Sequence, residues 1–255
     1  MSSIIDFHIK EFNLLEKYPK DVFYKGDLSL LNKRKVSIVG SRRPNAYCVK
    51  YTNLIANELS KRDIVVVSGA AMGVDAIAHK ASSVNNTIAV VANGLNIRYP
   101  AINSKLIEDI EKKGLVLSTY SDDEMPRNYT FVQRNELVVA LGEVLIVTQA
   151  DINSGSLRSI EFALKMNKKV YTLPHRLDES LGTQKLVEEG LIEPIYDLNK
   201  FFDTFGEIKV TTSELAAFIN SFPSYEEAVK KYKSKIFELE LEGIIKIENG
   251  FVRPL

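Results

Sequence analysis

The sequence predicts an α/β protein with a doubly wound, mostly parallel sheet, followed by a small C-terminal winged-helix domain. Two observations carry this prediction. From residue 35 onward, short β-branched runs alternate with stretches of helical periodicity, which is typical of right-handed β–α–β units. After residue 206 this alternation stops, and three short helical stretches lead into a hairpin signal.

Six apolar runs are expected to form the parallel strands of a main domain over residues 35–205. None of them alternates polar with apolar residues, as expected for strands covered by helices on both faces. The runs span residues 36–39, 64–67, 87–91, 115–117, 144–147 and 170–173. Helices are expected between them at residues 47–61, 74–83, 103–113 and 156–167.

Shorter segments flank this main domain. Residues 1–34 are expected to pack on it as a short extension, with an edge strand at residues 22–26 and two helical fragments. Residues 207–255 are expected to form the winged helix, with helices at residues 212–220, 224–231 and 233–242. The alternating residues on either side of Asn249-Gly250 predict a hairpin with a two-residue turn.

The composition excludes several classes of protein. The chain has 255 residues with 33 Lys and Arg against 33 Asp and Glu, so any binding to nucleic acid or membrane needs a local patch. A single cysteine, Cys48, excludes a disulfide scaffold, and three separated histidines give little basis for a metal centre. Asp6 and His8 interrupt the N-terminal apolar stretch, and Glu143 interrupts the best candidate for a membrane span. We therefore expect a cytoplasmic protein.

Three of the expected strands end in small or basic residues that lead into a helix. In sheets of this type ligands bind outside the carboxyl ends of the strands, and helix N-termini present unpaired N–H groups to anions. The segments are Gly40-Ser41-Arg42-Arg43, Ser68-Gly69 with Gly73, and Ser154-Gly155-Ser156, in which Ser156 is expected to cap its helix. Converging on one rim, they would form an anion-binding groove; the alternative is a set of plain turns with solvated arginines.

Neither a Walker loop nor a G-x-G-x-x-G motif is present, so ATP, NAD and other cofactors are not expected. The second of the three turns leads instead to Asp75 and His79, whose spacing places them on one helix face, where they can pair. Asp75 is expected to cap the helix, because a carboxylate repels phosphate. We predict structural roles for both side chains.

A further cluster lies at residues 127–136. Phe131, Arg134 and Asn135 place an aromatic ring beside basic and amide groups, which suits base stacking and backbone contact on a single nucleic-acid strand. The alternative is a helix start in which Phe131 enters the core and Arg134 pairs with Glu136 or with the acidic residues at 122–124.

Taken together, six short blocks in order resemble the DNA processing protein A family, also called DprA or Smf, over about residues 18–196. The blocks are residues 37–42 (Ser-Ile-Val-Gly-Ser-Arg), 67–69 with 73–79, 93–95 with 99–100, 131–135 (Phe-Val-Gln-Arg-Asn), 154–157 and 182–187. Residues 236–245 also resemble the helix and strand of the family's C-terminal winged helix.

The resemblance implies an extended Rossmann-like fold without catalytic residues. It implies that the protein binds single-stranded DNA with tolerance of sequence, forms a homodimer and loads the RecA recombinase during natural transformation. Carried over residue by residue, the DNA contacts fall on Gly40, Ser41, Arg42, Phe131, Arg134, Asn135 and residues 154–156.

The chain departs from the family's motifs at four places. Met72 and Glu136 stand where the family usually has Arg. Gln149 replaces a common acidic residue, and Pro174-His175 replaces Pro-Gly. These departures concern DNA affinity rather than the fold.

Charge argues against DNA recognition by the C-terminal segment. Residues 207–255 hold seven Lys and Arg against eight Glu, and the expected third helix ends in Glu238, Glu240 and Glu242, which repel phosphate. We therefore favour a surface for a protein partner or for dimerisation over reading of the DNA major groove.

Two other functions are alternatives for the chain as a whole. One is a nucleoside-monophosphate phosphoribohydrolase related to the lysine-decarboxylase-like proteins, for which Asp151 and Glu161 are the candidate carboxylates. The other is a sensor of a small anionic nucleotide with no role in DNA binding.

Overall fold

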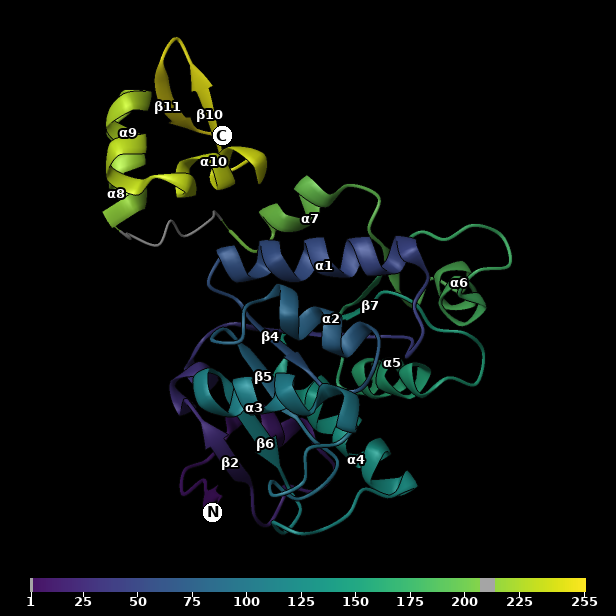
Figure 1. The fold of residues 1–255 in the computed structure, drawn as a ribbon. Helices are drawn as coiled ribbons and strands as arrows, with labels where there is room; N and C mark the ends of the chain where they lie inside the picture. The colour runs from purple at the N-terminus through teal and green to yellow at the C-terminus, as the bar shows by residue number, and fades with distance from the viewer. Residues whose placement is uncertain (1, 207–213) are drawn as a thin grey trace. The chain divides into compact units, whose positions relative to one another are not determined.

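The six predicted parallel strands lie together in one nine-stranded sheet (Figure 1). The structure, a computed structural model, describes residues 2–206 and 214–255. The six strands are β3 (Lys35–Val39), β4 (Val65–Ser68), β5 (Thr87–Val90), β6 (Leu115–Ser118), β7 (Leu145–Val147) and β8 (Val170–Thr172). Almost every residue in them is buried, which explains why the sequence shows continuous apolar runs.

The order of the strands reverses beside β3. The order is β1-β2-β6-β5-β4-β3-β7-β8-β9, so the chain winds from β3 outward to β6 and then returns to β7 on the other side of β3. β9 (Glu193–Pro194) extends the parallel part, whereas β2 (Phe23–Gly26) and β1 (Ser3–Ile4) add antiparallel strands beyond β6. A crevice is expected between the loops that follow β3 and β7, because they lead away in opposite directions.

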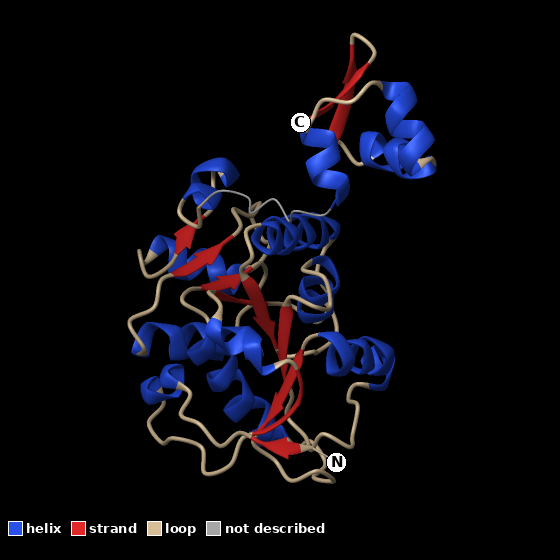
Figure 2. Cartoon of the chain, turned by 90° about the vertical axis from the view of Figure 1, so that its left-hand side faces the viewer, coloured by secondary structure: helices blue, strands red, loops and turns tan. Residues whose placement is uncertain are grey.

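Helices cover both faces of the sheet (Figure 2). One face carries α1 (Ala46–Lys61), α2 (Val74–Ala81), α3 (Ser104–Lys113) and α7 (Leu198–Asp203). The other face carries α4 (Asn128–Leu141), α5 (Gly155–Lys165), α6 (Leu181–Glu188) and two 3-10 turns, Lys10–Leu14 and Leu28–Asn32. Within the described ranges, none of the helices has both the length and the apolar character needed to span a bilayer.

The second half of α4 is apolar around its whole circumference. Residues 137–141 are all buried, packed against the sheet, α5 and the 3-10 turn Lys10–Leu14. The last carbonyls of a helix have no partner within the helix. In α4 the Lys168 ammonium supplies the missing donor. It donates to the carbonyls of Val139 (2.8 Å), Ala140 (2.6 Å) and Gly142.

The chain divides into two compact units, Met1–Ile208 and Lys209–Leu255. The smaller unit contains α8 (Glu214–Asn220), α9 (Tyr225–Tyr232), α10 (Ser234–Leu241) and a hairpin of β10 (Ile245–Glu248) and β11 (Phe251–Pro254). Asn249 and Gly250 both have positive φ, at 54° and 78°, as the predicted two-residue turn requires. This is the predicted order of elements; residues 212 and 213 of the predicted first helix lie outside the described residues.

His79 ties α2 to β5. Its Nδ1 lies 2.7 Å from the hydroxyl oxygen of Thr87, and its side chain is fully buried. The predicted pair with Asp75 is wrong, because the Asp75 carboxylate turns toward the loop before α2 and accepts from its amides instead. Burial, with the nearby positive charge of Arg134, lowers the pKa of His79 to about 3.

This buried histidine should make folding sensitive to acid. The unfolded chain takes up a proton near the ordinary pKa of about 6.5, whereas the folded chain does not until about 3, so stability falls as the pH is lowered between these values. Near pH 5.5 the loss from this group is on the order of 1 kcal/mol. His79→Asn, which keeps a polar atom near Thr87, should flatten the dependence of the unfolding free energy on pH between about 7 and 5.

Chemical denaturation at a series of pH values measures this slope. His8→Asn, which removes an exposed imidazole, is the matched control. If the free energy of unfolding falls equally in the wild type and in His79→Asn as the pH is lowered from 7 to 5, His79 is not the cause of the acid sensitivity.

Candidate nucleic-acid interface

A groove of about 430 Å³ opens at the carboxyl ends of β3 and β7, where the strand order reverses. Four segments form its walls: the loop after β3, the start of α2 with the loop before it, the first half of α4, and the loop after β7 with the first turn of α5. The lining residues are Val39, Gly40, Ser41, Arg42, Ala71, Asp75, Phe131, Val132, Arg134, Asn135, Ala150, Asp151, Ser154, Gly155, Ser156, Arg158 and Ser159. The predicted convergence of separate strand ends on one rim is therefore present.

The groove brings together most of the residues predicted to bind DNA. Those that line it are Gly40, Ser41, Arg42, Phe131, Arg134, Asn135, Ser154, Gly155 and Ser156. Gly69 lines a smaller pocket of about 30 Å³ that shares Arg42, Ala71, Phe131 and Arg134 with the groove. Arg43, Ser68 and Gly73 line neither cavity.

Gly73 and Ser68 support the groove from beneath. Gly73 has a φ of +78°, and a Cβ there would collide with the backbone of Ser41 and Arg42. The following amide, that of Val74, donates to the Ser41 carbonyl at 3.1 Å. Ser68 is fully buried and donates to the Ile38 carbonyl at 2.6 Å, so the structure does not bring it to the groove. The turn at Gly73 thus fixes the loop that carries Arg42, whereas Ser68 ties β4 to β3.

Arg42 and Phe131 face each other at the groove wall. The guanidinium carbon of Arg42 lies 5.6 Å from the centroid of the Phe131 ring, a distance at which cations and aromatic rings attract. The Tyr99 ring lies on the same phenylalanine, with 6.0 Å between the two centroids. Phe131 is half-buried rather than enclosed in the core, so part of its ring is available to a ligand.

Arg134 forms part of the groove floor but is almost wholly buried, with 4% of its surface exposed. One guanidinium nitrogen, Nη1, donates to the carbonyls of Gly69 and of Val90 (3.0 Å). Another, Nε, donates to the side-chain oxygen of Asn135 at 3.1 Å. The structure thus holds Arg134 by backbone carbonyls and not by Glu136 or residues 122–124. A Cβ at Gly69 would collide with the guanidinium, which accounts for the glycine there.

Asp75 provides the opposite charge for Arg134. Its carboxylate accepts from the amides of Gly69 (3.1 Å) and Ala71 (3.3 Å), so it stabilises the loop before α2 rather than capping the helix, whose N-cap is Gly73. Burial raises the pKa of Asp75, and the positive charge of Arg134 opposes that rise. The two buried charges therefore depend on each other.

The α5 terminus differs in detail from the prediction. The helix begins at Gly155 with Ser154 in the N-cap position, so the prediction of Ser156 as the cap is wrong by two residues. The Ser154 hydroxyl oxygen is buried and has no hydrogen-bond partner among the described residues. The first N–H groups of a helix lack partners within the helix, and here they lie at the groove. A Cβ at Gly155 would meet no atom within 4 Å, so its side of the helix is open.

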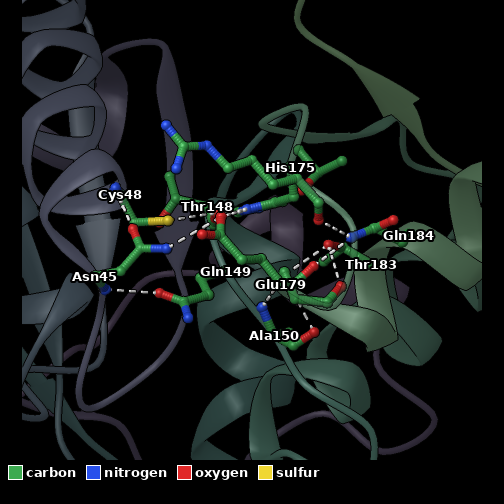
Figure 3. A network of polar contacts seen from close by, with 12 residues as sticks. Asn45, Cys48, Thr148, Gln149, Ala150, His175, Glu179, Thr183 and Gln184 are labelled. Atoms are coloured by element: carbon green, nitrogen blue, oxygen red, sulfur yellow. Dashed lines mark hydrogen bonds and ion pairs between the residues drawn. The ribbon is translucent and has the colours of Figure 1, made fainter.

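A polar network supports the rim between β7 and α1 (Figure 3). The Asn45 amide donates to the Gln149 side-chain oxygen at 3.0 Å, and the Asn45 side chain caps α1 by accepting from the Cys48 amide at 2.8 Å. Nε2 of His175 lies 3.0 Å from the Thr148 carbonyl. The Cys48 thiol also approaches that carbonyl, and burial raises its pKa to about 12. Two of the departures from the family motifs, Gln149 and His175, thus belong to the supporting structure.

The other two departures lie at different distances from the groove. Met72 lines the smaller pocket and is partly exposed. Glu136 lines neither cavity; burial and the nearby charge of Glu16 raise its pKa, and Lys165 opposes that rise. The charge reversal expected beside the groove is therefore on another side of α4.

Arg158 is a groove residue that the sequence analysis missed. It lies in the first turn of α5, four residues after Ser154 and on the same helix face. That spacing is the only signal in the sequence that could have indicated it.

The carboxylates proposed for glycoside hydrolysis do not meet in the groove. Asp151 lines it, but Glu161 does not, and its carboxylate pairs with Arg158 at 2.7 Å. In the part of the chain that the structure describes, no three His, Cys, Asp or Glu side chains cluster in a way that could hold a metal ion.

Comparison with known proteins identifies the family. Residues 8–206 match the model of the DNA recombination-mediator protein A family. The chain belongs to this family. It is 34% identical over 201 residues to DNA processing protein DprA of Bacillus subtilis, covering 77% of this chain and 67% of that protein. It is 37% identical over 176 residues to DprA of Streptococcus pneumoniae, covering 68% of this chain and 62% of that one.

Solved structures of family members share the fold. DNA processing protein A from Helicobacter pylori, described as having a unique single-stranded DNA binding mode, superposes with a TM-score of 0.78. It is 40% identical, over 80% of this chain and 95% of that one. DprA of Streptococcus pneumoniae gives a TM-score of 0.70 at 34% identity, over 76% of this chain and 70% of that one.

Replacing Arg134 should destabilise the fold before it affects binding. Arg134→Met leaves the Asp75 carboxylate uncompensated and two carbonyls without a donor, so we expect a loss of about 3–5 kcal/mol in the free energy of unfolding. The double variant Asp75→Asn, Arg134→Met should lose less than the sum of the two single variants, because neither charge is then left alone.

Urea denaturation tests this expectation. Arg43→Met, at an exposed arginine outside both cavities, is the matched control and should change stability by less than about 0.5 kcal/mol. A stable Arg134→Met protein that no longer binds DNA would show that Arg134 acts by direct contact instead.

Proposed function

We propose that this protein binds single-stranded DNA with tolerance of sequence, protects it, and loads the RecA recombinase onto it during natural transformation. Membership of the recombination-mediator family supports the general role. The observation that carries the DNA-binding part is the groove between β3 and β7, in which a basic side chain, a half-exposed aromatic ring and a helix N-terminus converge.

Each of these features suits a different part of a DNA strand. The Arg42 guanidinium can bind a phosphate oxygen pair in bidentate fashion, and the α5 N-terminus offers N–H groups to a second phosphate. The exposed part of the Phe131 ring can stack on a base, which contributes roughly 1–3 kcal/mol. None of these contacts reads the hydrogen-bonding edge of a base, so sequence tolerance follows. An unpaired strand is required, because bases in a duplex are already stacked.

Loading of RecA, and the homodimer that the family resemblance implies, both require protein-binding surfaces. On α10, Phe237 and Leu241 are exposed one turn apart, with the acidic Glu238 between them. Such a helix face repels phosphate and suits contact with a protein. A loader should raise the rate at which RecA assembles on a bound oligonucleotide, and an unchanged assembly rate would remove this part of the proposal.

Titration of a fluorescent oligonucleotide, as a single strand and as a duplex, tests DNA binding. Binding should favour the single strand and weaken with salt, with a slope of log affinity against log salt of about −0.7 for each neutralised phosphate. Arg42→Ala should weaken binding and reduce the magnitude of that slope by about 0.7. Arg43→Ala, which removes the adjacent exposed arginine, should change the slope much less.

Two outcomes would count against the proposal. Equal weak binding of single strand and duplex would remove single-stranded DNA as the ligand. If Arg42→Ala leaves the salt slope of binding unchanged, Arg42 does not contact a phosphate, although the protein can still bind DNA through other residues.

A further inference from the structure

We propose that Arg158 is a second phosphate-binding side chain of the groove and that Glu161 restrains it. This inference rests on the proposed binding of single-stranded DNA and extends it to a residue outside the predicted site.

The balance of charge in the groove singles out Arg158. The ionisable side chains among its described lining residues are Arg42, Arg134, Arg158, Asp75 and Asp151. Arg134 and Asp75 are both buried and offset each other. Asp151 offsets one of the two remaining arginines. The groove would therefore carry no net charge without Arg158, and an uncharged groove gains little from contact with a polyanion.

The position of Arg158 suits a phosphate at the start of α5. It lies one turn beyond Ser154, whose buried hydroxyl oxygen has no partner among the described residues. One helical turn spans about 5.4 Å along the axis, which an arginine side chain can reach across. A phosphate that accepts from the first N–H groups of α5 would thus lie within reach of the Arg158 guanidinium.

Glu161 holds the same guanidinium in the absence of DNA. Its carboxylate oxygen Oε2 lies 2.7 Å from Nη1 of Arg158, and the two side chains are 64% and 54% exposed. Exposed pairs of this kind are weak, because water screens both charges. A phosphate can therefore replace the carboxylate, but the carboxylate competes with it. Glu161 does not line the groove, so its removal leaves the groove walls unchanged.

Charge-neutral variants of each partner test the proposal in the same oligonucleotide titration. Arg158→Gln should lower affinity about three- to tenfold at low salt and reduce the magnitude of the salt slope by about 0.7. Glu161→Gln should raise affinity about two- to threefold at low salt, because it frees the guanidinium. In the double variant the gain from Glu161→Gln should disappear, since there is no guanidinium left to free.

Lys169 and Glu193 provide matched controls at the opposite ends of the strands. They form an ion pair of 3.6 Å with side chains 65% and 60% exposed, just before β8 and at the start of β9. Lys169→Gln and Glu193→Gln make the same changes in net charge away from the groove. They should alter affinity less than the groove variants, and circular dichroism should show all variants folded.

The outcomes separate the inference from the proposed function. Wild-type protein with no preference for single-stranded DNA would overturn the proposed function. If the wild type and Arg42→Ala behave as proposed but Arg158→Gln keeps the wild-type slope, Arg158 does not bind phosphate. A gain from Glu161→Gln that persists in the double variant would show that Glu161 acts through general charge and not by restraining Arg158.

Discussion

The buried guanidinium of Arg134 connects three parts of the larger unit that are far apart in the sequence. It links α4 to the Gly69 carbonyl after β4 and to the Val90 carbonyl at the end of β5. Burial of a cation costs free energy, and the opposite charge of Asp75 offsets part of that cost. The same carboxylate also holds the loop before α2 through its amides. Because Phe131 and Asn135 are on the same turn of α4 as Arg134, the floor and one wall of the groove depend on this contact.

The reversal of strand order places the remaining walls. The loops after β3 and β7 separate because their helices cover opposite faces of the sheet, and the space between them becomes the groove. Glycine and small polar residues keep that space open at the backbone. The proposed contacts with DNA then come from a few side chains, chiefly Arg42, Phe131 and Arg158. A neutral chain can in this way present a locally basic surface.

Most of the sheet could be predicted from the sequence, because buried parallel strands leave continuous apolar runs. The helix over residues 128–141 was harder, since its second half is buried on all sides and has no amphipathic period. The groove was predictable where glycines and arginines follow strands. The burial of Arg134 could not be predicted. Its partners are the backbone carbonyls of Gly69 and Val90, and every residue has such a carbonyl, so the residue types at these positions do not indicate the contact. Arg158 was missed because it follows a helix start by one turn.

The buried thiol of Cys48 has a practical consequence for studying the molecule in solution. It is the only cysteine of the chain, it lies in the first turn of α1 with its side chain buried, and its pKa of about 12 keeps it protonated at neutral pH. Reagents that modify thiolates should therefore not react with Cys48 in the folded protein. Site-specific labelling therefore does not require the replacement of Cys48. A single cysteine introduced on the surface would be the only position that carries the fluorophore or spin label.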